Sequence, residues 1–243
     1  MISAANTSYS TENTTYLTLD ATSLTSPTTK LTLASHLPHP QTRFTKIFSN
    51  AALHWILRGL APQHPNPDFT PLVDFFRACY DLLSPGGIFV SESGAHGNVG
   101  EVHAALVSAL IHRGIPAAEA RQASPWFFPS TKLMETVLTT AGFQVEVSEA
   151  EERPTEAIGG GVENWVRFFG AVFLDKVEEW VNNEREGGRG GDGGGEKGRQ
   201  AREDVVKEVA EAVEVVGRRV EDGRFMFGYV RLRIKARKPE SRE

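Results

Sequence analysis

The chain has 243 residues, 40% of them hydrophobic and 23% charged, which fits one large globular domain or one domain with a small appendage. A net charge of −5 excludes a strongly basic surface for nucleic acid or anionic membranes, and a single cysteine excludes a disulfide framework and a zinc site of ordinary ligand spacing. No apolar run can span a bilayer and no signal or transit peptide precedes Lys30, the first basic residue, so we expect a cytoplasmic protein.

The first part of the chain is polar and has little periodicity. Residues 1–15 are rich in serine, threonine and asparagine, which predicts a disordered start. Residues 16–19 form a short strand candidate, residues 22–42 are typical of a loop that could include one helical turn, and residues 44–49 form a second, apolar strand candidate.

The middle of the chain alternates between helical and strand patterns. The predicted elements are a helix over about 70–83, a strand over 88–92, helices over 99–113 and 130–141, and a strand over 143–147. Pro71 suits the first turn of its helix, and Gly114 and Gly142 are helix stops. This alternation predicts an α/β fold with a largely parallel sheet.

The last part of the chain contains two predicted helices and a strand. Residues 162–182 and 201–221 have helical apolar stripes, and residues 227–236 have the alternation of a strand. Residues 184–199 hold eight glycines and no hydrophobic residue, which predicts a flexible linker, because no strand precedes them and no GK[ST] sequence closes them.

Three strand candidates end in residues that could contact a ligand, namely Asp20, Asn50 and Glu92. Ligands of open parallel sheets bind at the carboxyl ends of the strands. A carboxylate there can accept hydrogen bonds from an adenine amine or a ribose hydroxyl, and small residues such as Ala51 and Ala52 let the backbone come close to a ligand.

Taken in order, six segments resemble the class I S-adenosylmethionine-dependent methyltransferases, and more narrowly the group that includes trans-aconitate methyltransferase. The segments are LDATSL (19–24), FSNAALHWI (48–56), LLSPGGIFVSE (82–92), PWFFPS (125–130), AGFQVEV (141–147) and FGYVRLRIKARKP (227–239). The resemblance implies a Rossmann-like α/β fold and a small-molecule methyltransferase activity, with a carboxylate as one candidate acceptor.

The resemblance also implies a domain organisation. Residues 16–158 would form a partial methyltransferase core, residues 159–226 a helical cap over the substrate, and residues 227–239 a terminal core strand. The strand order of the family is 3-2-1-4-5-7-6, so the strand at 44–49 would correspond to its fourth strand.

The resemblance assigns site residues by position. The cofactor S-adenosylmethionine would contact Asp20, Ala21, Asn50, Ala51 and Ala52. The candidates for contacting the substrate are His54, Trp55, Trp126, Arg153, Trp165 and Arg167.

The chain departs from the family pattern at its start. Family members begin with a strand, a glycine-rich DxGxGxG loop and a second strand that ends in an acid, and the nineteen residues before Asp20 contain none of these. We therefore expect an N-terminally truncated fold that lacks two central strands, with an unpaired edge on the strand at 44–49. The alternative function is a catalytically inactive methyltransferase-like fragment or interaction protein, and a nicotinamide-dependent oxidoreductase is the weakest interpretation.

Several candidate site residues also have purely structural interpretations. Methyl transfer by displacement needs alignment more than a base, so His54 is expected to be a packed histidine. Trp55 could be core or pocket wall, and Trp126 could anchor its own loop. Arg153 and Arg167 would suit a carboxylate, because guanidinium groups bind carboxylates through two parallel hydrogen bonds.

Overall fold

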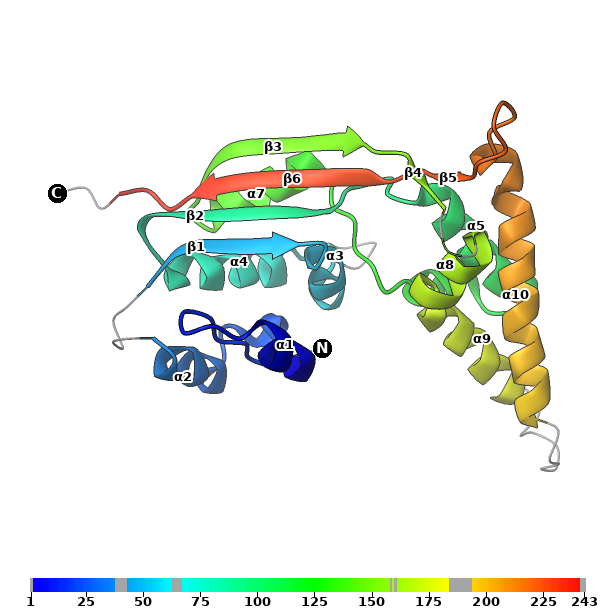
Figure 1. The fold of residues 1–243 in the computed structure, drawn as a ribbon, viewed down its shortest axis with the longest axis horizontal. Coiled ribbons are helices and arrows are strands. Elements are labelled where there is room, and N and C mark those ends of the chain that lie inside the picture. Colours follow the sequence, from blue (N-terminus) through cyan, green and yellow to red (C-terminus); the bar gives the residue numbers. More distant parts are fainter. Residues whose placement is uncertain are drawn as a thin grey trace. The chain divides into compact units, whose positions relative to one another are not determined.

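The computed structural model describes residues 2–37, 43–62, 67–157, 159, 161–183 and 194–240. It divides into two compact units (Figure 1). Unit 1 comprises Met1–Ser93, Pro129–Glu149 and Leu232–Glu243, and unit 2 comprises Gly94–Phe128 and Ala150–Arg231. Within the described ranges, no helix is both long enough and apolar enough to cross a membrane.

Unit 1 is built on a four-stranded sheet. Its strands are β1 (Phe44–Asn50), β2 (Leu83–Gly94), β6 (Val230–Arg237) and β3 (Gln144–Glu152), in the order β1-β2-β6-β3. β1 and β2 are parallel, whereas β6 runs opposite to β1 and β3 in Figure 1. The predicted α/β class is confirmed, and the strand order matches the 4-5-7-6 half of the sheet that the resemblance implies. The sheet is mixed rather than largely parallel.

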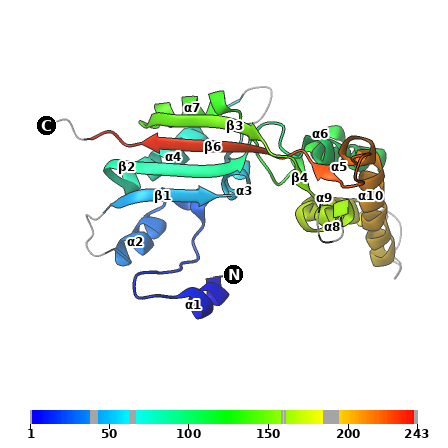
Figure 2. The same cartoon turned by 45° about the horizontal axis from the view of Figure 1, so that its top comes forward.

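Two helices, α4 (Thr70–Leu82) and α7 (Thr131–Thr140), cover one face of this sheet (Figures 1 and 2). Buried residues recur along α4 at helical spacing, and Ser130 caps α7 by accepting a hydrogen bond from Leu133 N at 3.2 Å. The ring of Phe89 on β2 packs edge-on against Phe76 of α4, with centroids 5.6 Å apart. Each such buried aromatic contributes about 1.5–3 kcal/mol through loss of apolar surface from water.

β1 lies at one end of the strand order, so among the described residues one of its edges is unpaired, as predicted. Phe48 on this strand is 72% exposed, and Lys46 and Asn50 are exposed as well. Glu92, the β2 partner of Asn50 in the register, forms an ion pair with β6, which suits a sheet face in contact with water. Arg233 pairs with Glu92 at 2.9 Å between Nε and Oε2.

The N-terminal segment differs from the prediction in three places, the third being a nine-residue helix within the predicted loop of residues 22–42. The predicted disordered start contains helix α1 (Ile2–Tyr9), which buries no residue and is supported locally by Thr7 Oγ1 donating to Ser3 O. The predicted strand at 16–19 is wrong: these residues have no regular structure and lead into the 3₁₀ helix η1 (Ala21–Ser23). Helix α2 (Pro27–Ser35) follows, with Ser26 as its cap.

Unit 2 is a helical unit with a hydrophobic core of its own. Its helices are α5 (Gly100–His112), α6 (Ala117–Gln122), α8 (Gly161–Phe169), α9 (Ala171–Asn183) and α10 (Gly194–Gly217), and β4 (Thr155–Glu156) pairs antiparallel with β5 (Met226–Phe227). α10 packs against α5, α8 and α9, and its buried valines meet aromatic and aliphatic side chains from those helices.

Several predicted boundaries in this region need correction. The helix predicted over 162–182 is broken at Gly170 into α8 and α9, and the helix predicted over 201–221 begins at Gly194 and ends at Gly217. Residues 184–193 of the predicted linker lie outside the described residues, whereas residues 194–199 are helical. The units also divide the chain differently from the predicted core and cap, because α5 and α6 belong with α8, α9 and α10.

Candidate functional site

The carboxyl end of β1 has an unusual backbone conformation. Ala51, the first residue after the strand, has φ = 54°, in the left-handed region that residues other than glycine seldom adopt. Its N–H donates to Glu92 O at 2.8 Å, so the turn is fixed to the neighbouring strand. Backbone strain of this kind is stored most often at functional sites. The end of β1 is therefore the candidate ligand site of unit 1.

Glu92 lies beside Asn50, because the two residues are partners in the parallel register of β1 and β2. The Glu92 carboxylate accepts from Arg233 Nε at 2.9 Å, and Arg233 Nη1 lies 3.7 Å from Glu149 Oε1. The strand end therefore carries an exposed amide next to a carboxylate that is already ion-paired. Sequence reasoning missed Arg233, although the alternation of basic and apolar residues in RLRIKAR could have placed it on the face of Glu92.

Asp20 caps the short helix η1. Its Oδ1 accepts from Thr22 N at 2.9 Å and from Thr22 Oγ1 at 2.7 Å. The side-chain and backbone hydrogen bonds from Thr22 lower the pKa of this exposed carboxyl, so it is anionic at neutral pH. The cap fixes the direction of the carboxylate.

The predicted cofactor residues lie on neighbouring segments. η1, which begins at Ala21, packs against the 3₁₀ helix η2 (Leu57–Leu60). η2 directly follows helix α3 (Leu53–Ile56), and Ala52 is the N-cap of α3. The structure therefore brings the LDA and SNAALHW segments to one part of unit 1.

His54 and Trp55 lie side by side on α3 but differ in exposure. His54 is only 9% exposed, whereas Trp55 is 40% exposed, and their ring centroids are 5.7 Å apart. The burial of His54 is what a packed histidine would show. Trp55 presents part of its indole at the surface, where it could contact a small molecule.

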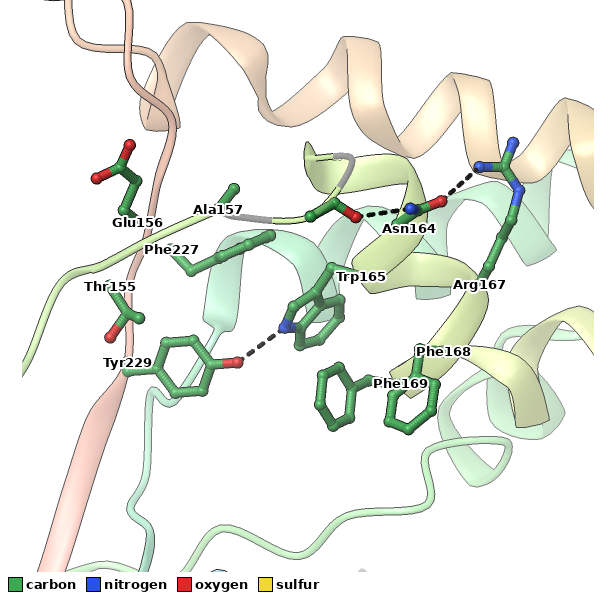
Figure 3. A pocket seen from close by; sticks show the side chains of 11 residues that line it. Thr155, Glu156, Ala157, Asn164, Trp165, Arg167, Phe168, Phe169, Phe227 and Tyr229 are labelled. Atoms are coloured by element: carbon green, nitrogen blue, oxygen red, sulfur yellow. Dashed lines mark hydrogen bonds between the residues drawn. The ribbon is translucent and has the colours of Figure 1, made fainter.

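Unit 2 contains a second candidate site, an aromatic pocket of about 660 Å³ (Figure 3). Aromatic side chains from α8 and from the segment around β5 form much of its wall: Trp165, Phe168, Phe169, Phe227 and Tyr229. Trp165 Nε1 donates to Tyr229 Oη at 2.7 Å, and Figure 3 shows this bond across one side of the pocket. The volume lies within the range of about 300–1,000 Å³ that is typical of small-molecule sites.

Arg167 lines this pocket but is paired with two carboxylates. Its Nη2 lies 2.8 Å from Glu203 Oε2 and 3.1 Å from Glu163 Oε2. The hydrogen bond to Glu203 is the main cause of a raised Arg167 pKa, and the bond to Glu163 adds to it. A guanidinium held in this way is a poor clamp for a further carboxylate.

Of the two remaining substrate candidates, Trp126 is part of the core and Arg153 is at the surface. Trp126 is 6% exposed and packs against Phe128, His103 and Trp165, with ring centroids 5.5–6.0 Å apart. Arg153 is exposed, and its backbone N–H donates to Tyr229 O at 2.7 Å. The structure thus supports the anchoring interpretation of Trp126.

The chain is similar to a protein of Schizosaccharomyces pombe that is named an uncharacterized methyltransferase. The two are 32% identical over 199 residues, which cover 82% of this chain and 64% of that protein. The chain therefore spans less than two thirds of the length of this relative. The predicted resemblance to methyltransferases is confirmed at this level, whereas the narrower trans-aconitate group is not.

No protein-family model matches the chain. Among solved structures, a loganic acid methyltransferase with SAH is 15% identical with a TM-score of 0.43, over 82% of this chain and 62% of that one. The YcgJ protein of Bacillus subtilis is 13% identical with a TM-score of 0.41, over 86% of this chain and 69% of that one.

Proposed function

We propose that this chain, as a relative of a methyltransferase, is an S-adenosylmethionine-dependent methyltransferase that acts on a small molecule. The observation that carries the proposal is the 32% identity over 82% of the chain. The strained strand end at Ala51, beside Asn50, supports it independently, since the carboxyl ends of parallel strands are where such sheets bind ligands.

The residues present at the strand end suit an adenosine-containing cofactor. In the proposed site the Asp20 carboxylate accepts a hydrogen bond from the adenine amine or a ribose hydroxyl. Ala21, Ala51 and Ala52 keep the surface low enough for the cofactor to approach, and the Asn50 amide contacts its methionine end. Residues 2–37 contain no glycine, so in this segment side chains rather than a glycine-rich loop would hold the ligand.

When bound, the cofactor supplies an activated methyl group. The protein's task in such a displacement is to align donor and acceptor, which can lower a barrier by several kcal/mol without any acid or base. We therefore assign His54 a packing role beneath the site and Trp55 a role as a surface for the acceptor. Arg167 is already paired with Glu163 and Glu203, so it offers no open guanidinium to a carboxylate acceptor.

The chain offers a matched pair of aspartates for testing this site. Asp68 is exposed and accepts from Thr70 N at 2.9 Å, and hydrogen bonds from Thr70 lower its pKa just as those from Thr22 lower the pKa of Asp20. Titration calorimetry of the full chain with S-adenosylmethionine should show a Kd on the order of micromolar. Asp20→Ala should weaken binding about tenfold, as expected for a lost hydrogen bond to a charged group, and Asp68→Ala should leave it unchanged.

Adenosine triphosphate serves as a second ligand, because it shares the adenosine group but lacks the methionine end. It should bind more weakly than S-adenosylmethionine. No heat with either ligand would overturn the proposal and favour an inactive methyltransferase-like fragment or an interaction protein. Equal losses in the Asp20 and Asp68 variants would overturn the assignment of Asp20.

A further inference from the structure

The aromatic pocket of unit 2 is built around a firmly positioned tyrosine. The backbone on either side of Tyr229 is held by two side chains: Gly228 N donates to Glu101 Oε1 at 2.7 Å, and Val230 N donates to Asn98 Oδ1 at 2.9 Å. Asn98 is 4% exposed, and Arg153, which lies between β3 and β4, donates its backbone N–H to Tyr229 O at 2.7 Å. A residue whose backbone is held in this way can offer a hydrogen bond to a ligand with little further loss of conformational entropy.

The polar groups of the pocket are largely used within the protein. Asn164 Nδ2 donates to Gly159 O at 2.7 Å, and Asn164 Oδ1 accepts from Arg167 Nη1 at 3.4 Å. Thr155 Oγ1 donates to Arg153 O at 2.9 Å. The Tyr229 hydroxyl accepts from Trp165, so its own hydrogen is left, and among the described residues it has no acceptor. The pocket therefore presents one hydroxyl donor on an aromatic wall.

The charges at the rim are also matched within the protein. Arg167 faces Glu163 and Glu203, and Glu156 lies 3.3 Å from Arg224 Nη1. An anionic ligand would have to compete with these carboxylates for Arg167. Its charged group would lose its hydrogen bonds to water and gain no other cationic partner among the described residues that line the pocket. Burying an unpaired carboxylate against aromatic rings is costly, whereas a neutral ring system gains from the same surface.

We propose that this pocket binds a planar, uncharged aromatic molecule that carries one hydrogen-bond acceptor, with the acceptor on the Tyr229 hydroxyl and the rings against Trp165, Phe168 and Phe169. Phe168 is 76% exposed and Phe169 37% exposed, so their faces are accessible. The proposal concerns residues of unit 2 alone and holds whether or not the chain transfers methyl groups.

Two naphthalene derivatives of similar size test whether the pocket selects its ligand by charge, because they share the same rings and differ in the charge of the acceptor group. 2-Acetylnaphthalene is neutral and has a carbonyl acceptor, and 2-naphthoate has the same rings with an anionic carboxylate. Calorimetry with the full chain should show that 2-acetylnaphthalene binds at least about tenfold more tightly, given the cost of burying an unpaired charge. Equal affinity, tighter binding of 2-naphthoate, or no binding of 2-acetylnaphthalene would overturn the proposal.

Three variants locate the binding. Tyr229→Phe removes the donor and should weaken 2-acetylnaphthalene about three- to tenfold, the usual value of one hydrogen bond. Phe168→Ala removes an exposed ring and should weaken it about threefold or more. Val215→Ala, at an 87% exposed site of the same unit, is the control and should change nothing.

Since Phe168 is exposed, its variant stays informative even if Tyr229→Phe lowers the melting temperature. If 2-acetylnaphthalene binds the Phe168 variant as tightly as the unchanged protein, the ligand is elsewhere and the proposal is wrong.

Discussion

Cys79 is a single thiol on the buried face of α4, with 3% of its surface exposed. Burial raises the pKa of this thiol to about 12, so at pH 8 almost none of it is the reactive thiolate. We expect a disulfide reagent to modify no thiol in the folded chain and one thiol per chain in denaturant, measured by absorbance. Rapid labelling without denaturant would contradict the packing of α4 on the sheet.

Glu146 on β3 accepts hydrogen bonds from Arg237 and Lys235, the latter with Nζ 2.8 Å from Oε2. The bond from Arg237 is the first cause, and that from Lys235 the second, of a pKa lowered from 4.5 to about 2. Because the folded value is depressed, the stabilisation is present above pH 4.5 and is lost as the pH falls towards 2.

This loss can be measured by urea unfolding between pH 6 and pH 3. Glu146→Gln should be less stable than the unchanged chain at pH 6, and the difference should shrink by pH 3. Glu211→Gln, at an exposed position of α10, is the control. A difference that is constant with pH would show that the ion pairs of Glu146 do not contribute.

A helix or strand was predictable where its capping residues and its apolar stripe both match the face that it buries in the core. The start of α4 at Thr70-Pro71, its apolar stripe and the Ser130 cap of α7 are local, and each of these elements lies where it was expected. The break between α8 and α9 was not predicted, because the apolar stripe of residues 162–182 continues across Gly170. The pairing of Arg167 with Glu203 was not predicted either, because the two residues are 36 positions apart in the chain and meet only where α8 packs against α10.

Gly170 provides a direct test of that break. A Cβ atom at this position would lie 2.6 Å from Val166 O and 3.4 Å from Leu106 Cδ1. Gly170→Ala should therefore destabilise the chain by about 1–3 kcal/mol through overpacking, seen as a lower melting temperature. Gly100→Ala, where nothing lies within 4 Å, is the matched control and should be neutral or slightly stabilising.

At the scale of the whole molecule, the two proposed ligands fall on different units. S-adenosylhomocysteine, added at about 100 times its Kd, should stabilise what it binds by about 2.7 kcal/mol. In hydrogen-exchange mass spectrometry we expect it to protect residues 44–60 of unit 1. 2-Acetylnaphthalene should protect residues 161–169 of unit 2 instead.

Protection of the same residues by both ligands would contradict the assignment of separate sites.

The division into units was only partly predictable from the chain. The predicted cap contains α8, α9 and α10. That α5 and α6 share their core could not be predicted, because a short apolar stripe does not show which partner will cover it.

β6, the last strand described, lies between β2 and β3 in the finished sheet. During synthesis, β2 and β3 therefore leave the ribosome long before the strand that joins them. Until then each of them has an open edge, and a nascent chain with open strand edges is prone to aggregate and to be bound by chaperones. The yield of folded protein in a host cell should accordingly depend on chaperone capacity during translation as well as on the stability of the final fold.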